Sequence, residues 1–259
     1  LEDGADVRVF VRSRDRAQRW GGRVQVAAGD LDEPATIERA VDGVESLFML
    51  GLSESQDAAL VRSAVEAQVR RVVMLSSGGV PYGVASGAMH KAGEDLLRGS
   101  GLDWTILHPY EFMSNALFWA PSINGGGVVV DCSGDGRHAL IDPLDIAAAA
   151  AAVLTGEGHQ GQTYLLTGPQ AITRAEMAAE IGRQSGREVR HQDVPGPAYR
   201  DMVSSFGMPP DMVDPLISFL LMVRAGELDQ VSPEVERLTG RPPRTFPDWL
   251  AENVAAFSS

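Results

Sequence analysis

Apolar and β-branched residues gather in five short runs in the first part of the chain, each bounded by Gly, Ser, Asp or Pro. Runs of this length and composition are typical of β-strands. Between the runs, apolar residues recur at helical spacing. This alternation predicts a parallel sheet with helices on both faces. The predicted strands are Asp6–Val11, Arg23–Ala27, Ser46–Leu50, Arg71–Leu75 and Asp103–Leu107, and the predicted helices are Pro34–Val41, Ser55–Gln68 and Ser86–Ser100.

After Pro109 the regular alternation gives way to glycine clusters and shorter elements. Thr173 and Glu176 form a capping box that opens a helix, and Gly186 ends it. We predict two regions, residues 1–120 and a small C-terminal lobe of residues 121–259, with residues 140–170 returning to the sheet. The predicted elements of the second region are strands Val128–Asp131, Thr163–Leu166 and Arg187–Asp193, helix Asp142–Leu154 capped by Asp142 or Asp145, helix Thr173–Ser185, and a helical stretch from Ala198 broken by Pro209-Pro210, Pro215 and Pro233.

Charge and composition narrow the classes of partner. The chain has 259 residues, a net charge of −13 and a pI of about 4.8. A surface this acidic repels phosphate backbones and anionic membranes, so we expect neither nucleic acid nor a membrane as a partner. The longest apolar stretches, Ile146–Leu154 and Ile217–Val223, are far shorter than the ~20 residues of a membrane span. Whether the chain forms a homo-oligomer is left open.

Cysteine and histidine usage bears on location and metal binding. The single cysteine, Cys132, permits no internal disulfide, which indicates a reducing compartment and hence a cytoplasmic location. His138, His159 and His191 are scattered along the sequence, and no Cys, Asp or Glu stands at ligand spacing from them. We therefore predict no metal site.

Short motifs stand at the ends of several predicted strands and helices. Val9–Arg16 combines a strand with a basic turn, and Gly29-Asp30-Leu31-Asp32 follows the next strand. The others are Glu94 with Ser100-Gly101-Leu102-Asp103-Trp104-Thr105-Ile106-Leu107-His108-Pro109, then Phe112-Met113-Ser114-Asn115, Gly134-Asp135-Gly136-Arg137 and Ile141–Ala147. Their order and spacing resemble those of the NmrA-like atypical short-chain dehydrogenases/reductases. His108 replaces the arginine that is usual in that family, and we assign it no role.

This resemblance implies a doubly wound, mostly parallel Rossmann sheet that binds NADP(H) at the carboxyl ends of its strands, with a small C-terminal α+β lobe that binds the substrate. The family's first strand and Gly-rich pyrophosphate-binding turn have no counterpart before Asp6. We expect them in the ~25–30 residues ahead of Leu1, the length of a βα unit. The alternative is a truncated product that binds no dinucleotide.

The adenosine end of the cofactor is predicted to lie at the first two strands. Arg12 follows a strand where NAD-selective enzymes carry an acidic residue, so it suits the 2′-phosphate of NADP. Arg16 resembles the family's second basic position. By the same resemblance, Asp30 accepts from the adenine amino group and Leu31 packs on the ring. The alternatives are solvated arginines in an arginine-rich turn and a turn-forming aspartate.

The nicotinamide end departs from the superfamily's Tyr-x-x-x-Lys pair. Counting back from Glu94 places Ser86 at the tyrosine position and His90 at the lysine position, one helical turn apart. Lys91 is one residue out of register and is expected to be solvated. The usual substrate-orienting hydroxyl position falls on Gly78. We predict His90 and Tyr110 as catalytic residues, with Tyr82 as the other acid candidate. Further cofactor contacts are predicted at Leu50, Gly51, Ser76, His90, Pro109, Tyr110 and Phe112.

These residues predict an NADP(H)-dependent oxidoreductase that acts on a small apolar acceptor such as a quinone, an azo compound or an enone. The alternative is a non-catalytic NADP(H)-binding redox sensor, which the loss of both Tyr and Lys favours. Pocket walls are expected from Tyr110–Leu117 and from an apolar set that is equally consistent with plain core: Phe206, Met208, Met212, Leu216, Phe219 and Met222.

Overall fold

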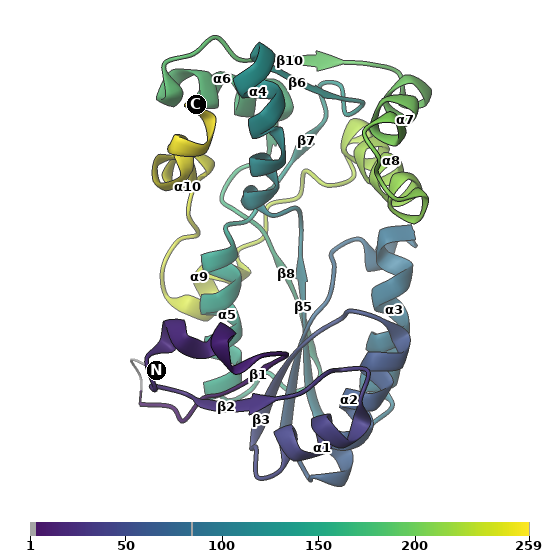
Figure 1. The fold of residues 1–259 in the computed structure, drawn as a ribbon, viewed down its shortest axis with the longest axis vertical. Coiled ribbons are helices and arrows are strands. Elements are labelled where there is room, and N and C mark those ends of the chain that lie inside the picture. Colours follow the sequence, from purple (N-terminus) through teal and green to yellow (C-terminus); the bar gives the residue numbers. More distant parts are fainter. Residues whose placement is uncertain (1–3, 84, 259) are drawn as a thin grey trace.

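A four-stranded parallel sheet forms the centre of the molecule (Figure 1). The computed structural model describes residues 4–83 and 85–258, apart from the side chains of residues 85, 86, 88 and 89, which include Ser86. The strand order is β3-β4-β5-β8, and all three pairings are parallel. These strands are β3 (Ser46–Leu50), β4 (Arg71–Leu75), β5 (Asp103–Pro109) and β8 (Gln162–Leu166).

A second, two-stranded parallel sheet lies on the β3 side of the first (Figure 1). It consists of β1 (Arg8–Val11) and β2 (Gln25–Ala28), which are joined by the 3-10 helix η1 (Arg14–Trp20). Because β1 is not hydrogen-bonded to β3, that edge of the four-stranded sheet is open. Phe48 and Leu50 of β3 are exposed to 38% and 45%.

Helices cover both faces of the four-stranded sheet, as predicted. On one face, α1 (Pro34–Val41), α2 (Glu54–Glu66) and α3 (Ala85–Arg98) enclose a core with Met49, Met74 and Ile106. On the other face, α5 (Pro143–Thr155) and α9 (Glu234–Thr239) pack against the strands. The buried alanines of α5 let that helix approach the sheet closely, and Asp142 rather than Asp145 caps it by accepting from the Leu144 N–H.

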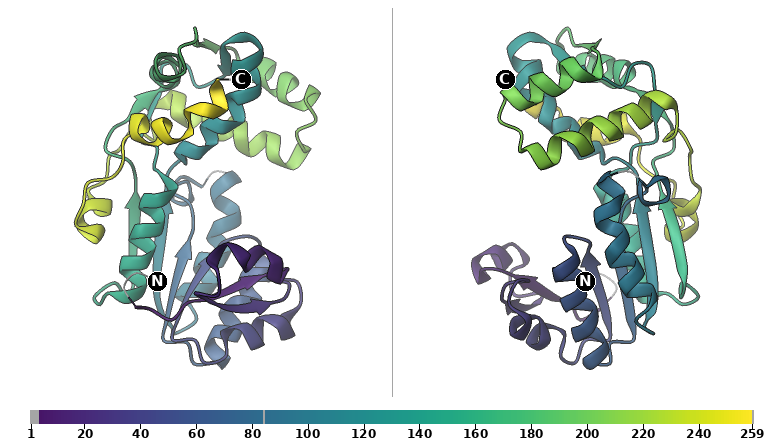
Figure 2. Two further views of the ribbon diagram at one scale, coloured as in Figure 1. Left: turned by 60° about the vertical axis from the view of Figure 1, so that its left-hand side comes forward. Right: turned by 90° about the vertical axis from the view of Figure 1, so that its right-hand side faces the viewer.

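The remaining elements form a lobe above the carboxyl ends of β5 and β8 (Figures 1 and 2). Its core centres on Met113, Ile123 and Met177. Two small sheets belong to it: β6 (Val128–Asp131) with β10 (Arg190–Asp193), and β7 (Arg137–His138) with β9 (Ile172–Thr173). Its helices are η3 (Met113–Trp119), α4 (Ala120–Gly126), α6 (Arg174–Ser185), α7 (Gly196–Ser205), α8 (Pro210–Ala225), α10 (Phe246–Asn253) and η4 (Val254–Phe257).

The predicted fold class is confirmed, and most element boundaries shift by one to three residues. The capping box of Thr173 and Glu176 is present, and Gly186 ends α6 with a positive φ of 71°. One predicted helix break is wrong, because Pro215 lies inside α8. It stands close to the helix start, so it removes one early backbone hydrogen bond, while Ile217 and Leu220 bury the helix beyond it.

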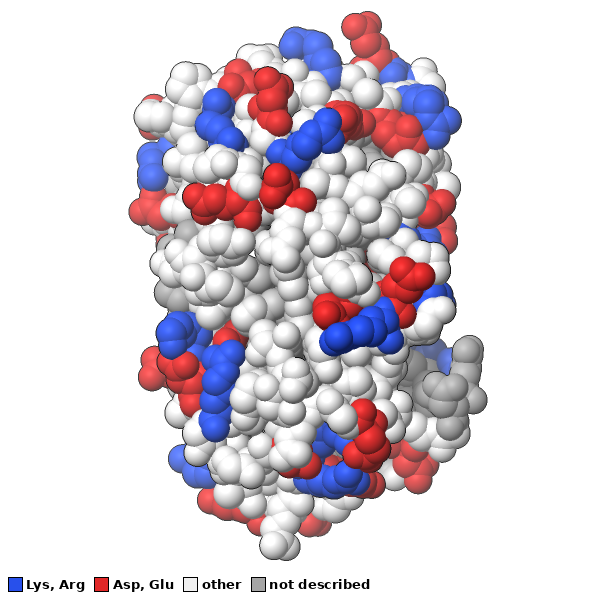
Figure 3. Space-filling view, turned by 180° about the vertical axis from the view of Figure 1, so that it is seen from behind, with Lys and Arg blue, Asp and Glu red and all other residues white. Residues whose placement is uncertain are grey.

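Acidic and basic side chains are interspersed over the surface. On the face in Figure 3, red and blue groups lie next to each other at both ends of the molecule and on the right-hand side at mid-height. Many of the described arginines are paired with carboxylates, as in Arg137–Glu176 and Arg183–Glu180. Within the described residues, no helix is long and apolar enough to span a membrane.

Candidate active site

Most of the predicted cofactor contacts lie at the carboxyl edge of the parallel strands. Arg12 directly follows β1, Asp30 closely follows β2, Gly51 follows β3, Ser76 follows β4, and Pro109 ends β5. Parallel strands bring their carboxyl ends to one edge of a sheet, where ligands of doubly wound folds bind. Gly51, Ser76 and Pro109 therefore lie along the carboxyl edge of the four-stranded sheet, and Arg12 and Asp30 lie at the carboxyl ends of the separate β1–β2 sheet.

At the adenosine end, the structure brings Arg12 and Asp30 together. The Arg12 Nε lies 3.5 Å from a carboxylate oxygen of Asp30, and the two side chains are exposed to 70% and 37%. The turn is fixed by Thr36, whose hydroxyl contacts both the Asp30 N–H and the Asp30 carbonyl. Arg16 is exposed within η1, and Leu31 packs against the core below α1 and α2. Arg12 thus remains accessible to an anion.

At the nicotinamide end, His90 of α3 lies over Gly51. A Cβ added to Gly51 would fall 2.7 Å from His90 Nδ1, so only glycine leaves room for the imidazole there. That Nδ1 is buried and has no hydrogen-bond partner. Burial lowers the pKa of His90, Glu94 opposes this shift, and His108 adds to it. The ring is therefore a neutral, unsatisfied hydrogen-bonding group at the edge where the cofactor is expected.

Behind His90, the buried carboxylate of Glu94 joins three polar side chains. Its Oε1 accepts from the Ser76 hydroxyl and lies 2.6 Å from His108 Nε2. Its Oε2 forms an ion pair of 2.8 Å with Arg98. Despite complete burial, these contacts hold the pKa of Glu94 below its usual value. The structure thus gives His108, which the sequence left without a role, a partner in the core.

Lys91 points away from this group, as predicted. Its ammonium pairs with Asp95 at 2.5 Å, and both side chains are exposed to 56%. A one-residue change of register on a helix rotates a side chain by about 100°, which separates Lys91 from His90. Lys91 is therefore a surface residue on the same helix.

Tyr110 is buried at the start of the C-terminal lobe. Its ring covers Gly78, where a Cβ would fall 2.5 Å from the ring. Its hydroxyl lies 3.3 Å from that of Tyr82, which also donates to the Glu227 carbonyl at 3.0 Å. Burial, helped by the contact with the Tyr82 hydroxyl, raises the pKa of Tyr110 well above its usual value. Tyr110 consequently stays protonated and offers a hydrogen-bond donor rather than an acidic proton.

The predicted pocket walls divide between core and surface. Met222 is buried, and Met208, Leu216 and Phe219 are partly buried against α7 and α8. Phe206 and Met212, which flank the turn between α7 and α8, are exposed to 82% and 56%. Phe112 packs against the α5 side of the sheet.

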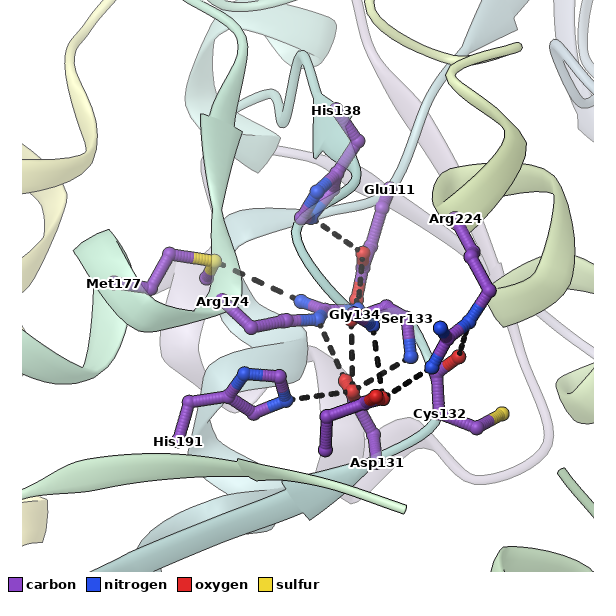
Figure 4. Close-up of polar contacts among 11 residues, drawn as sticks. Glu111, Asp131, Cys132, Ser133, Gly134, His138, Arg174, Met177, His191 and Arg224 are labelled. Atoms are coloured by element: carbon purple, nitrogen blue, oxygen red, sulfur yellow. Dashed lines mark hydrogen bonds and ion pairs between the residues drawn. The ribbon is translucent and has the colours of Figure 1, made fainter. Parts of the chain in front are cut away.

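A buried charge cluster in the lobe escaped the sequence analysis (Figure 4). Arg174, at the start of α6, donates to both oxygens of Glu111 at 3.0 and 2.8 Å and to Asp131 at 3.0 Å. His138 lies 3.0 Å from Glu111, and His191 lies 2.9 Å from Asp131. These two histidines are far apart in the sequence, but β7 and β10 bring them to one network.

The pKa values in this cluster follow from its pairing. Arg174 and His138 hold the pKa of Glu111 at about 2 against the effect of burial. Burial and Arg174 lower the pKa of His138. A pattern search over sequence could not find this cluster, since its members are spread between Glu111 and His191. The described residues contain no group of three His, Cys, Asp or Glu side chains that could hold a metal ion.

Comparison with known proteins identifies the family. Residues 1–157 match the model of a family described as NAD(P)H-binding, which is more than half of the chain. The chain belongs to this NAD(P)H-binding family. This result confirms the predicted resemblance to the atypical short-chain dehydrogenases/reductases.

Relatives match along the whole length of this NAD(P)H-binding protein. A (4-alkanoyl-5-oxo-2,5-dihydrofuran-3-yl)methyl phosphate reductase from Streptomyces griseus is 36% identical, over 100% of this chain and 93% of its own. An NAD(P)H azoreductase from Xenophilus azovorans is 34% identical, over 97% of this chain and 91% of its own. The structure of an NADPH-dependent quinone oxidoreductase from Escherichia coli, in complex with NADPH, superposes with a TM-score of 0.89 at 27% identity, covering 100% of this chain and 93% of that one.

Proposed function

We propose that this protein is an NADPH-dependent reductase that transfers a hydride to a small conjugated carbonyl compound, an enone or a quinone. The observation that carries the proposal is His90, an imidazole with an unpartnered buried nitrogen over Gly51 at the cofactor edge. The relatives support the reaction type, because the names of both curated relatives describe reductases.

The carboxyl-edge residues fit a nicotinamide dinucleotide. We assign Arg12 and Arg16 to the 2′-phosphate and Asp30 and Leu31 to the adenine. The residues at the other end of the edge are assigned to the nicotinamide half: Leu50, Gly51, Ser76, His90, Pro109, Tyr110 and Phe112. The bound nicotinamide supplies the hydride. The unpartnered His90 nitrogen and the side-chain-free Gly51 are the features of this structure that suit such a ligand.

The protein's own groups then orient the reactants. The hydride adds to the acceptor's electron-poor carbon, the π electrons move to the carbonyl oxygen, and that oxygen or its α-carbon takes a proton. Tyr110 stays protonated and turns its hydroxyl hydrogen from Tyr82 to that oxygen when the acceptor is bound. His90 stays neutral near pH 7 and holds a hydroxyl of the nicotinamide ribose. The acceptor binds between the sheet edge and the lobe of residues 121–259, and solvent supplies the proton.

Enones and quinones are favoured because their reduced oxygen is a stabilised anion that needs little acid help. This suits a site in which the described candidates are a neutral imidazole and a phenol with a raised pKa. It also matches the relative from Streptomyces griseus, which is named for reducing a (4-alkanoyl-5-oxo-2,5-dihydrofuran-3-yl)methyl phosphate, an unsaturated lactone conjugated to carbonyl groups.

The test is NADPH oxidation with 2-cyclohexenone, menadione and methyl red as acceptors, alongside direct measurement of NADPH binding. Turnover of an enone or the quinone is expected, and His90→Ala should lower kcat by about 10²-fold, because loss of its hydrogen bond to the ribose misplaces the nicotinamide. Lys91→Ala is the matched control on the same helix and should leave kcat within about twofold. Tight NADPH binding without turnover of any acceptor would contradict the proposal and favour a redox sensor.

A further inference from the structure

The buried carboxylate of Glu94 stands at a junction of three elements. It lies on α3, and its Oε1 contacts both Ser76, which follows β4, and His108 on β5. Its Oε2 pairs with Arg98 from the next turn of α3. Burying a carboxylate costs several kcal/mol unless partners compensate it, so all three contacts are needed to keep it ionised inside the core. The arrangement therefore depends on the positions of α3 and both strands.

The hydrogen bond from Ser76 to Glu94 fixes the direction in which the Ser76 hydroxyl donates. A serine hydroxyl has one hydrogen and two lone pairs, and the hydrogen is directed to the Glu94 carboxylate, which can only accept. The Ser76 backbone N–H donates to the Leu107 carbonyl at 2.9 Å, which holds the residue against β5. Ser76 can therefore act only as an acceptor toward the cofactor edge.

The same carboxylate fixes the helix that carries His90. His90 precedes Glu94 by one turn of α3, and neighbours at this spacing share a helix face. Since Glu94 ties that face to β4 and β5, His90 is held over Gly51 with its Nδ1 unpartnered. A single anchored carboxylate thus sets the position of two of the predicted cofactor contacts.

We propose that Glu94 and His108 form a buried positioning pair, which holds Ser76 and His90 for the reaction and sets the charge of His90. This inference rests on the proposed function. The Glu94 anion lies one helical turn from His90 and favours a positive charge on its imidazole, whereas a cation at position 108 disfavours it.

Other charged groups also surround the pair among the described residues. Arg98 and its second partner Asp95 lie on α3, with Arg98 exposed to 36%. Asp57 of α2 lies against Gly93, the residue before Glu94. These groups stay unchanged when His108 is replaced, so the effect of that replacement on His90 can be isolated.

The experiment measures the titration of His90 directly, without relying on turnover. Imidazole resonances of the cofactor-free protein are followed by NMR from pH 5 to 9, and His90→Gln assigns the His90 signal. His108→Arg, which adds a permanent cation, should lower the His90 pKa by about one unit, and His108→Gln, which removes the charge, should raise it relative to His108→Arg. Glu94→Gln should lower it as well. Lys91→Ala is the control and should leave it unchanged.

Steady-state kinetics provides the second readout. The acid limb of the kcat profile should move in the same direction as the His90 pKa in each variant, whereas a merely structural role would reduce kcat equally at every pH. If Glu94→Gln fails to fold, the two His108 variants still decide the question. Identical His90 titration in His108→Arg and His108→Gln overturns the proposal. Shifted titration without any NADPH oxidation leaves this pair intact and refutes the proposed function instead.

Discussion

Replacing Arg174 should destabilise the protein more than replacing almost any other arginine. The Arg174 side chain is 3% exposed, makes three hydrogen bonds to Glu111 and Asp131, and stacks on Trp119 with its guanidinium 4.9 Å from the ring centroid. Arg174→Met preserves bulk and leaves two buried carboxylates with only histidine, hydroxyl and backbone N–H partners. Breaking a buried pair in this way costs about 3–5 kcal/mol.

The predicted loss can be read from thermal and urea unfolding. For a protein of this size, 1 kcal/mol corresponds to roughly 2–4 °C, so the Tm should fall by about 6–20 °C. Arg183→Met is the matched control, because Arg183 lies on the same helix, pairs with Glu180 and is 67% exposed. An exposed pair contributes about 0–1 kcal/mol, so the control should barely shift the Tm.

The pH dependence of the stability loss provides a second, independent test of this prediction. In the native protein the pKa of Glu111 is depressed to about 2 from 4.5, so its contribution to stability is present above pH 4.5 and is lost as pH falls toward 2. Without Arg174, burial dominates and the pKa of Glu111 rises above 4.5. The variant's deficit should therefore be larger at pH 8 than at pH 5. An equal loss in both arginine variants, or a deficit that grows on acidification, would refute the reasoning.

Three further predictions concern the cofactor edge. Arg12→Ala should lower the affinity for NADPH by about ten- to a hundredfold and leave the affinity for NADH little changed. Asp30→Asn should strengthen NADPH binding slightly, because Arg12 loses a competing carboxylate. Calorimetric titration of both cofactors checks this, and equal effects on the two cofactors contradict it. Asp57→Asn should raise the free energy of unfolding by about 1–3 kcal/mol at pH 8 but not at pH 4. Burial raises the Asp57 pKa to about 6, so the stability that the protonated carboxyl contributes is lost as the pH rises through that value. Urea unfolding at both pH values measures the effect, and a gain at pH 4 alone speaks against it. Gly51→Ala should displace His90 and lower kcat, because the added Cβ falls 2.7 Å from the ring nitrogen, and it should also lower the Tm, because the same Cβ falls 2.8 Å from buried Met74. An unchanged kcat would show that His90 is not held there.

The central sheet could be predicted well from the sequence, because strands that are buried on both faces consist almost entirely of apolar residues. Val72, Val73 and Met74 of β4 are fully buried, and a continuous apolar run of this length is typical of a strand that is buried on both faces. Caps were equally readable, as at Thr173, because a capping box depends on residues only three apart. Contacts of this short range are encoded locally.

Contacts between side chains on different helices and strands could not be predicted from the sequence in the same way. His108 and Glu94 are 14 residues apart, and their 2.6 Å contact depends on how α3 packs against β5. Arg174 resembles an ordinary helix-start arginine in a chain where nearly all basic charge is arginine. Burial alone distinguishes it from its exposed neighbours, and burial of a charged residue is a tertiary property.

The buried cluster around Arg174 also restricts how acceptor preference can change. Glu111 directly follows Tyr110, at the point where the chain leaves β5 for the lobe, so that segment is anchored by an ion pair in the core. A substitution that widened the site there would have to uncover a charge and lose several kcal/mol. The turn between α7 and α8 has no such anchor, since Phe206 and Met212 are already exposed. Natural variation and directed evolution toward larger acceptors should therefore accumulate changes in the α7–α8 hairpin and leave the segment after β5 unaltered.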